Sequence, residues 1–180
     1  MKNLLNTLDR ILDERFKGEE SEYNSFKLYE KNNEKSPVSY LQKKRKGLCY
    51  HFPVEEKDLI LILNKKVKNI TSLCDFFVFF PHKEILFVFL CELKTNSTKG
   101  SSNQVQTSEI LARYIISMAE KELDFKKFNI EYRALIFSTS SKTEFDTNIS
   151  KPSPYFQYEN GLKHKHLKLG ENYKIELLCY

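Results

Sequence analysis

Two long apolar runs separated by a short polar segment constrain this chain more than any other feature. Residues 74–80 and 85–94 are rich in phenylalanine, valine, isoleucine and leucine, and the Pro-His-Lys-Glu segment 81–84 lies between them. Aromatic and β-branched residues favour strands, and a polar turn between two such runs is typical of an antiparallel hairpin. The second run is apolar on both faces, which predicts a central strand that is covered on both sides.

Three charged residues interrupt this apolar pattern, and all of them lie at the end of the hairpin opposite the turn. If residues 81–84 form the turn, counting back along both strands puts Asp75 opposite Leu90. Glu92 is then a diagonal neighbour of Asp75, at about 7–8 Å. Side chains alternate along a strand, so Glu92 and Lys94 share one face. The sequence therefore predicts that two carboxylates and one ammonium group meet at the open end of the hairpin.

This set of groups is suited to binding a divalent metal ion. Two adjacent carboxylates repel each other unless a cation joins them. Oxygen ligands suit Mg²⁺ or Mn²⁺, and a lysine beside such an ion can orient a water molecule or stabilise developing negative charge. Charged residues also end many strands simply as solvated surface groups. The position of Asp75, seventeen residues before Glu92 at the matching end of a paired strand, favours the metal site.

The order of Asp75, a hairpin and then Glu92-x-Lys94 resembles the metal-binding signature of the PD-(D/E)xK nuclease superfamily. Cys74 stands where many members have a proline, and the resemblance covers residues 70–140. It implies a restriction-endonuclease-like fold and a Mg²⁺- or Mn²⁺-dependent endonuclease in which both carboxylates bind the metal. It also implies that the lysine is catalytic, and it favours DNA over RNA as the substrate, in defence, restriction or repair, with RNA cleavage left open.

A helix is predicted after the hairpin, from about residue 103 to residue 123. Gln104 precedes Leu111 of its apolar stripe by seven residues, which places Gln104 about 20° from that stripe and on the inward face. The resemblance implies that such a glutamine supports the active site, although an amide near the helix start without a catalytic role is the alternative. Lys99 and Ser102, at the start of this helix, are candidate contacts to a phosphate.

The N-terminal part of the chain is predicted to be helical. Residues 4–16 carry apolar side chains at helical spacing, and the aromatic residues that follow have similar spacing, so residues 1–35 are expected to form a helical region. In many nucleases of the resembled superfamily an early helix adds one acidic residue to the metal site. Glu19 and Glu22 remain open as candidates for that role.

The remaining apolar segments complete a single domain that spans the whole chain, with its core at about residues 55–140. Residues 58–63 form either a buried strand or a short helix, and residues 131–139 and 173–179 read as strands. A strand, helix and strand in succession imply a right-handed crossover between parallel neighbours. The expected fold is α/β (α+β), with a mixed central β-sheet flanked by helices.

The C-terminal region, residues 140–180, is polar and basic, with aromatic residues among the cations. This composition is typical of nucleic-acid binding, with Lys163 and Lys165 as candidate contacts. His164 and His166 would share one face of a strand. Two histidines without further ligands make a poor zinc site.

Overall composition is compatible with a protein that binds nucleic acid in the cytoplasm. Net charge is +5, the four cysteines form no CxxC pair, and no apolar run is long enough to span a membrane. The start of the chain lacks the apolar core of a signal peptide. A domain of this size is expected to dimerise or to work beside a partner protein that selects the target. The alternative function is a catalytically silent nucleic-acid-binding or scaffold protein of the same fold.

Overall fold

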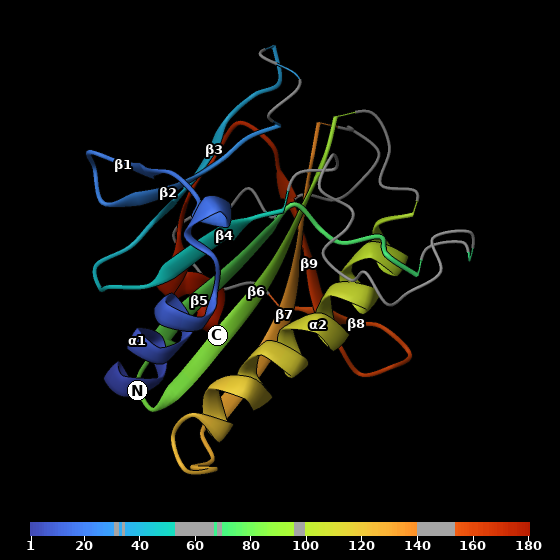
Figure 1. Cartoon of the computed structure of the whole chain (residues 1–180). Helices are drawn as coiled ribbons and strands as arrows, with labels where there is room; N and C mark the ends of the chain where they lie inside the picture. The colour runs from blue at the N-terminus through green and yellow to red at the C-terminus, as the bar shows by residue number, and fades with distance from the viewer. Residues whose placement is uncertain (31–32, 34, 53–66, 68–69, 96–99, 140–153) are drawn as a thin grey trace.

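The computed structural model describes residues 1–30, 33, 35–52, 67, 70–95, 100–139 and 154–180. Within these residues the chain forms a six-stranded sheet, a four-stranded sheet and two α-helices (Figure 1). Both sheets contain parallel and antiparallel pairs. The expected α/β fold with a mixed sheet is confirmed.

The predicted hairpin lies in the middle of the six-stranded sheet, whose order is β4-β5-β6-β7-β9-β8. Strands β5 and β6 are antiparallel, whereas β6, β7 and β9 run parallel to one another. The carboxyl ends of these three strands therefore lie at one edge of the sheet. The bounds are Leu48–His51 for β4, Phe76–His82 for β5, Ile85–Lys94 for β6, Asn129–Ser138 for β7, Phe156–Gln157 for β8 and Lys163–Lys168 for β9.

The turn of the hairpin has two residues, Lys83 and Glu84, rather than the four predicted. Lys83 has a φ of 54°, the left-handed conformation that two-residue hairpin turns commonly require. The prediction that Asp75 lies opposite Leu90 is therefore wrong. Extending the observed register by one residue puts Asp75 opposite Glu92. The register differs by two residues, so every side chain keeps its predicted face.

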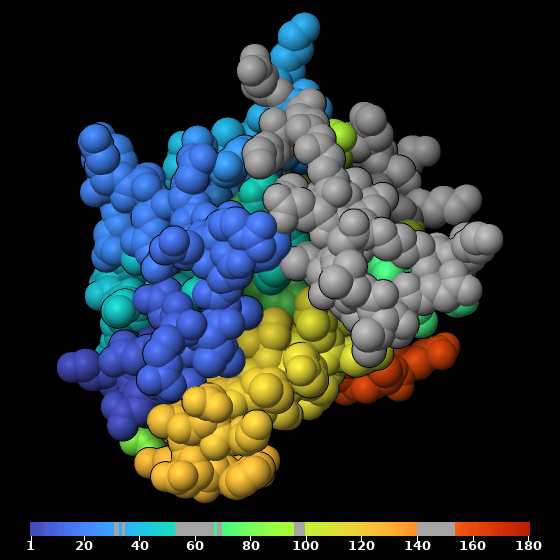
Figure 2. Space-filling model, viewed as in Figure 1, coloured from blue at the N-terminus to red at the C-terminus, as the bar shows by residue number. Residues whose placement is uncertain are grey.

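Two helices cover one face of this sheet and pack side by side across it (Figures 1 and 2). Helix α2, Ser101–Lys121, agrees with the predicted helix to within two residues at each end. Helix α1, Lys2–Ile11, is shorter than predicted, and a 3₁₀ turn, η1, follows at Glu14–Phe16. The apolar residues between helices and sheet include Leu4, Leu8, Phe77, Val88, Leu90, Val105, Ala112 and Ala134.

The four-stranded sheet covers the other face of the central hairpin, in the order β1-β2-β3-β10. The predicted helical region over residues 1–35 is wrong beyond α1 and η1, because Phe26 and Leu28 alternate on a strand and bury their side chains. The predicted strand 173–179 is β10 followed by a 3₁₀ turn, and residues 58–63 lie outside the described part. Bounds are β1 Glu20–Ser21, β2 Ser25–Leu28, β3 Ser39–Gln42, β10 Asn172–Lys174 and η3 Ile175–Cys179.

Two further features concern the state of the cysteines and the character of the helices. All four cysteines are buried and carry free thiols. Among the residues that the structure describes, no helix combines the length and the apolar character needed to cross a membrane.

Candidate active site

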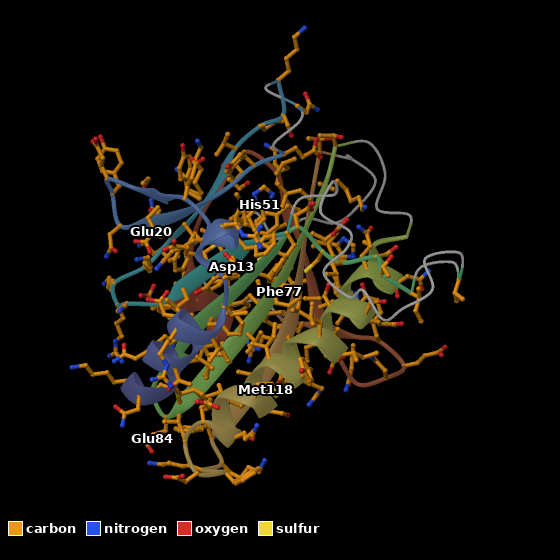
Figure 3. The ribbon with its side chains drawn as sticks, viewed as in Figure 1. Asp13, Glu20, His51, Phe77, Glu84 and Met118 are labelled. Carbon is orange, nitrogen blue, oxygen red and sulfur yellow. The ribbon has the colours of Figure 1, made fainter. Side chains whose placement is uncertain are left out.

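Asp75 and Glu92 come from the two strands of the hairpin at its open end, far from the turn that Glu84 marks in Figure 3. Glu92 belongs to the helix-covered face, since its neighbours Cys91 and Leu93 pack against the small sheet. Asp75 precedes β5, between Cys74, which packs on the helix side, and Phe76, which packs against the small sheet. Asp75 is fixed where β5 begins. Its Oδ2 accepts a hydrogen bond of 2.7 Å from the Leu93 amide, and its carbonyl accepts one of 2.8 Å from the Phe52 amide.

Glu92 is almost completely buried, with 1% of its surface exposed. The Lys94 ammonium forms an ion pair with Glu92 Oε1, whereas Glu92 Oε2 is buried and has no partner among the described residues. Lys94 Nζ also donates a hydrogen bond of 2.6 Å to Gln104 Oε1. Gln104 Nε2 in turn donates to the Leu73 carbonyl at 3.3 Å. The predicted inward position of Gln104, beside the end of β6, is confirmed.

Burial dominates the electrostatics of the two carboxyl groups. Desolvation raises the pKa of Glu92 to about 8, and the nearby charge of Asp75 adds to this shift while Lys94 opposes it. Desolvation also raises the pKa of Asp75 to about 6. The hydrogen bond from the Leu93 amide and the charge of Lys94 lower this pKa, because both favour the ionised form. The negative charge at this site is therefore poorly stabilised by the protein alone.

These raised pKa values predict that the metal-free protein loses stability as pH rises. The unfolded chain releases the Glu92 proton near the ordinary glutamate pKa of 4.5, whereas the folded chain holds it up to a pKa of about 8. Folding stability is therefore full below pH 4.5 and declines between 4.5 and 8, by roughly 2–4 kcal/mol. Asp75 adds a smaller decline between about pH 4 and 6. Urea unfolding in EDTA should show that Glu92→Gln removes most of the decline; parallel pH curves for the two proteins would contradict this assignment.

Glu19, one of the two N-terminal acids that the sequence left open, has hydrogen-bond partners of its own. Glu19 accepts hydrogen bonds from Lys27 at 2.9 Å and from the Tyr29 hydroxyl at 2.8 Å, so it serves the small sheet. Glu30 is the N-terminal acid whose charge raises the pKa of Asp75. The sequence did not single out Glu30, because Glu30 follows strand β2, a segment that was predicted to be helical.

The remaining predicted contacts lie in different environments. Lys99 lies outside the described residues. Ser102 is in the first turn of α2, two residues from Gln104, and its hydroxyl accepts a hydrogen bond of 3.3 Å from Gln106 Nε2. Ser102 is thus near the site, although its side chain is engaged within the helix.

Neither of the predicted C-terminal lysines is brought to the site. Lys163 forms an exposed ion pair with Glu131 at 2.8 Å. Lys165 is buried on the opposite face of the sheet from Glu92, with Nζ 4.5 Å from the centre of the Tyr155 ring. Strand β9 sends alternate residues to opposite faces, and both lysines lie on the face away from Glu92. The basic and aromatic composition of the region carries no signal of that face.

Comparisons of the chain with protein-family models, with curated proteins and with solved structures find no match. Within the described part of the chain, no three or more His, Cys, Asp or Glu side chains are grouped so that they could hold a metal ion. The candidate site consists of two carboxylates, a lysine and a glutamine. Its function has to be argued from their geometry and chemistry.

Proposed function

We propose that the protein is a Mg²⁺- or Mn²⁺-dependent nuclease that hydrolyses phosphodiester bonds, with DNA as the preferred substrate. The observation that supports this most is the pairing of buried Glu92 with Lys94, which Gln104 holds from helix α2. Asp75 lies beside them at the open end of the hairpin, where its charge acts on Glu92 and the charge of Lys94 acts on Asp75. This arrangement fits the nuclease signature that the sequence resembles.

The donor atoms fit a small, hard cation. Mg²⁺ is usually held by one or two carboxylates, with water and substrate phosphate oxygens completing its six ligands. Asp75 and Glu92 supply two carboxylates, and Glu92 Oε2 is a buried oxygen without a partner in the described region. A divalent ion between them would offset the repulsion that helps to raise the pKa of Glu92. Two protein ligands also leave room for water and phosphate.

The chain's own residues have distinct roles in this proposal. A bound metal ion would supply positive charge to a phosphoryl oxygen and lower the pKa of a coordinated water. Lys94 would stabilise the negative charge that develops on the phosphate in the transition state. Gln104 orients the Lys94 ammonium, and its own amide is held by the Leu73 carbonyl. The Leu93 amide fixes the carboxylate of Asp75.

Replacing Lys94 with methionine should lower cleavage by roughly 10²-fold or more, because the ammonium that faces the developing charge is lost. The assay uses linear duplex, circular and single-stranded DNA and RNA, each with Mg²⁺, Mn²⁺ or EDTA. The matched control is Lys163→Met, which removes an exposed lysine that is paired with Glu131. That control should cleave like the wild type.

The metal site itself should survive the Lys94→Met substitution, so Mn²⁺ should still raise the melting temperature of the variant. Two results would argue against the proposed function. One is a Lys94→Met variant as active as the wild type. The other is a folded wild-type protein that cleaves none of these nucleic acids with either metal.

A further inference from the structure

Buried polar atoms without partners gather at one edge of the six-stranded sheet. Within the described residues, seven buried side-chain polar atoms lack a hydrogen-bond partner, and three of them are Glu92 Oε2, Ser138 Oγ and His166 Nδ1. These three residues lie at the carboxyl ends of β6, β7 and β9. Buried polar atoms in proteins are nearly always bonded, so a cluster of exceptions requires an explanation.

The strand register puts the three residues on one surface. Glu92 pairs with Ile136 of β7, and Ile136 pairs with His166 of β9, while Lys94 pairs with Ser138. Register partners in parallel strands project to the same face. The residues that alternate with Ser138 and His166 pack towards the small sheet, which leaves both on the helix-covered face, as Glu92 is.

The distance between neighbouring strands places Ser138 and His166 beside the candidate metal site. Neighbouring strands lie about 4.8 Å apart, so the backbones of Glu92 and His166 are separated by about 10 Å, with β7 between them. Ser138 is level with Lys94 on that middle strand. In sheets with parallel strands, ligands bind beyond the carboxyl ends of the strands. Glu92, Ser138 and His166 lie at that edge of this sheet.

The chemistry of the two side chains fits a phosphate oxygen. A hydroxyl and an imidazole N–H are both hydrogen-bond donors. Burial lowers the pKa of His166, so the ring offers a neutral N–H rather than a charge at neutral pH. Lys168, which is level with Ser138 on β9, forms a 3.2 Å ion pair with Glu171. Among the described residues at these strand ends, Ser138 Oγ and His166 Nδ1 therefore remain without a partner, and the imidazole can donate from Nδ1 in one of its two tautomers.

We propose that Ser138 and His166 form a second phosphate-binding subsite, which holds the phosphate next to the one that is cleaved beside Asp75 and Glu92. The proposal rests on the proposed nuclease function and narrows its substrate class to a polynucleotide strand. A small phosphodiester with a single phosphate would occupy only the metal subsite. An oligonucleotide would contact both, and the second contact would set the register of cleavage.

The test uses Ser138→Ala and His166→Gln, each of which removes or replaces one polar group with little change in volume. The matched control is His82→Gln, because His82 also has an unpartnered Nδ1 but lies at the turn end of the hairpin, where its Nε2 is 3.1 Å from the Tyr180 hydroxyl. Thermal unfolding shows that each variant is folded. If His166→Gln does not fold, the comparison is made with Ser138→Ala only.

Three measurements are made on each full-length protein. The first is the Kd for a fluorescein-labelled oligothymidylate by anisotropy with Ca²⁺ as the metal. The second is hydrolysis of bis(p-nitrophenyl) phosphate, a single diester, with Mn²⁺. The third is the rise in melting temperature with Mn²⁺ alone. Each subsite variant should weaken oligonucleotide binding roughly tenfold, leave the other two measurements unchanged, and differ from the control.

A modified substrate locates the contact. A neutral methylphosphonate placed at one position next to the cleaved bond should weaken binding to the wild type but not weaken binding to His166→Gln any further. The subsite is ruled out if both variants bind the oligonucleotide like the wild type, or if hydrolysis of the single diester falls by the same factor as oligonucleotide binding. Weakened binding by the variants, with no cleavage of any nucleic acid by the wild type, would retain the subsite and reject the nuclease function.

Discussion

The Glu92→Gln variant is expected to lose metal-dependent phosphodiester hydrolysis by roughly 10³-fold or more while keeping its fold. Glutamine has nearly the same shape as glutamate, and its amide oxygen can still accept a hydrogen bond from Lys94. It lacks the charge that a divalent ion requires. The buried site also has little solvent to replace the lost ligand, because only 1% of Glu92 is exposed.

A second buried glutamate provides the matched control for this prediction. Glu109 of α2 is 8% exposed and pairs with Arg113 at 2.6 Å and with Asn160 at 3.2 Å, away from the hairpin end. Glu109→Gln should retain activity within about twofold of the wild type, since it only weakens hydrogen bonds outside the site. Asp75→Asn should behave like Glu92→Gln. Wild-type rates in Glu92→Gln, measured with Mg²⁺ and Mn²⁺, would refute the assignment of that residue.

The largest loss of stability is expected from Arg133→Met, at about 2–3 kcal/mol, because hydrogen bonds of a buried charged group and its ring contacts are lost. The Arg133 guanidinium is buried between the rings of Phe87, at 4.7 Å, and Tyr155, at 4.5 Å. It donates a hydrogen bond of 2.6 Å to the Leu178 carbonyl and pairs with Glu131 at 2.8 Å. This side chain ties the C-terminal 3₁₀ turn to strand β7. Its loss would remove one partner from the Glu131 carboxylate, which keeps Lys163, and one from the Leu178 carbonyl, which keeps the Tyr155 hydroxyl.

An exposed arginine with similar contacts shows whether burial or the type of contact determines the loss of stability. Arg113 also lies over an aromatic ring, that of Tyr132 at 4.2 Å, and also pairs with a glutamate, but 58% of its side chain is exposed. Arg113→Met should therefore cost less than about 1 kcal/mol. Urea unfolding at pH 7 measures both variants. Equal losses for the two would show that burial of Arg133 is not what makes it important.

The hairpin and its charged end could be predicted because the information is local. Apolar runs, alternation and the positions of Asp75, Glu92 and Lys94 are all visible within twenty residues. The exact register could not be predicted, because Pro81 reads as part of the turn. The structure places Pro81 inside β5, where it is tolerated because the neighbouring strand β4 pairs only as far as Phe79.

The small sheet and the second subsite depend on pairings between distant parts of the chain. Tyr23, Phe26 and Tyr29 have the spacing of a helix, yet β2 forms a strand because β3 pairs with it and buries Phe26. His166 lies level with Glu92 only because β9 joins the sheet beside β7, about thirty residues further along the chain than its partner. Local spacing carries no signal of either pairing.

The central claim is that Asp75 and Glu92 together hold one divalent ion, and anomalous diffraction from crystals soaked in Mn²⁺ tests it most directly. The account predicts one anomalous peak at the open end of the β5–β6 hairpin, within about 2.5 Å of an oxygen from each carboxylate. It also predicts that Glu92→Gln crystals lack this peak. No peak beside Asp75 and Glu92 in well-ordered wild-type crystals, or an ion that contacts neither carboxylate, would contradict the claim.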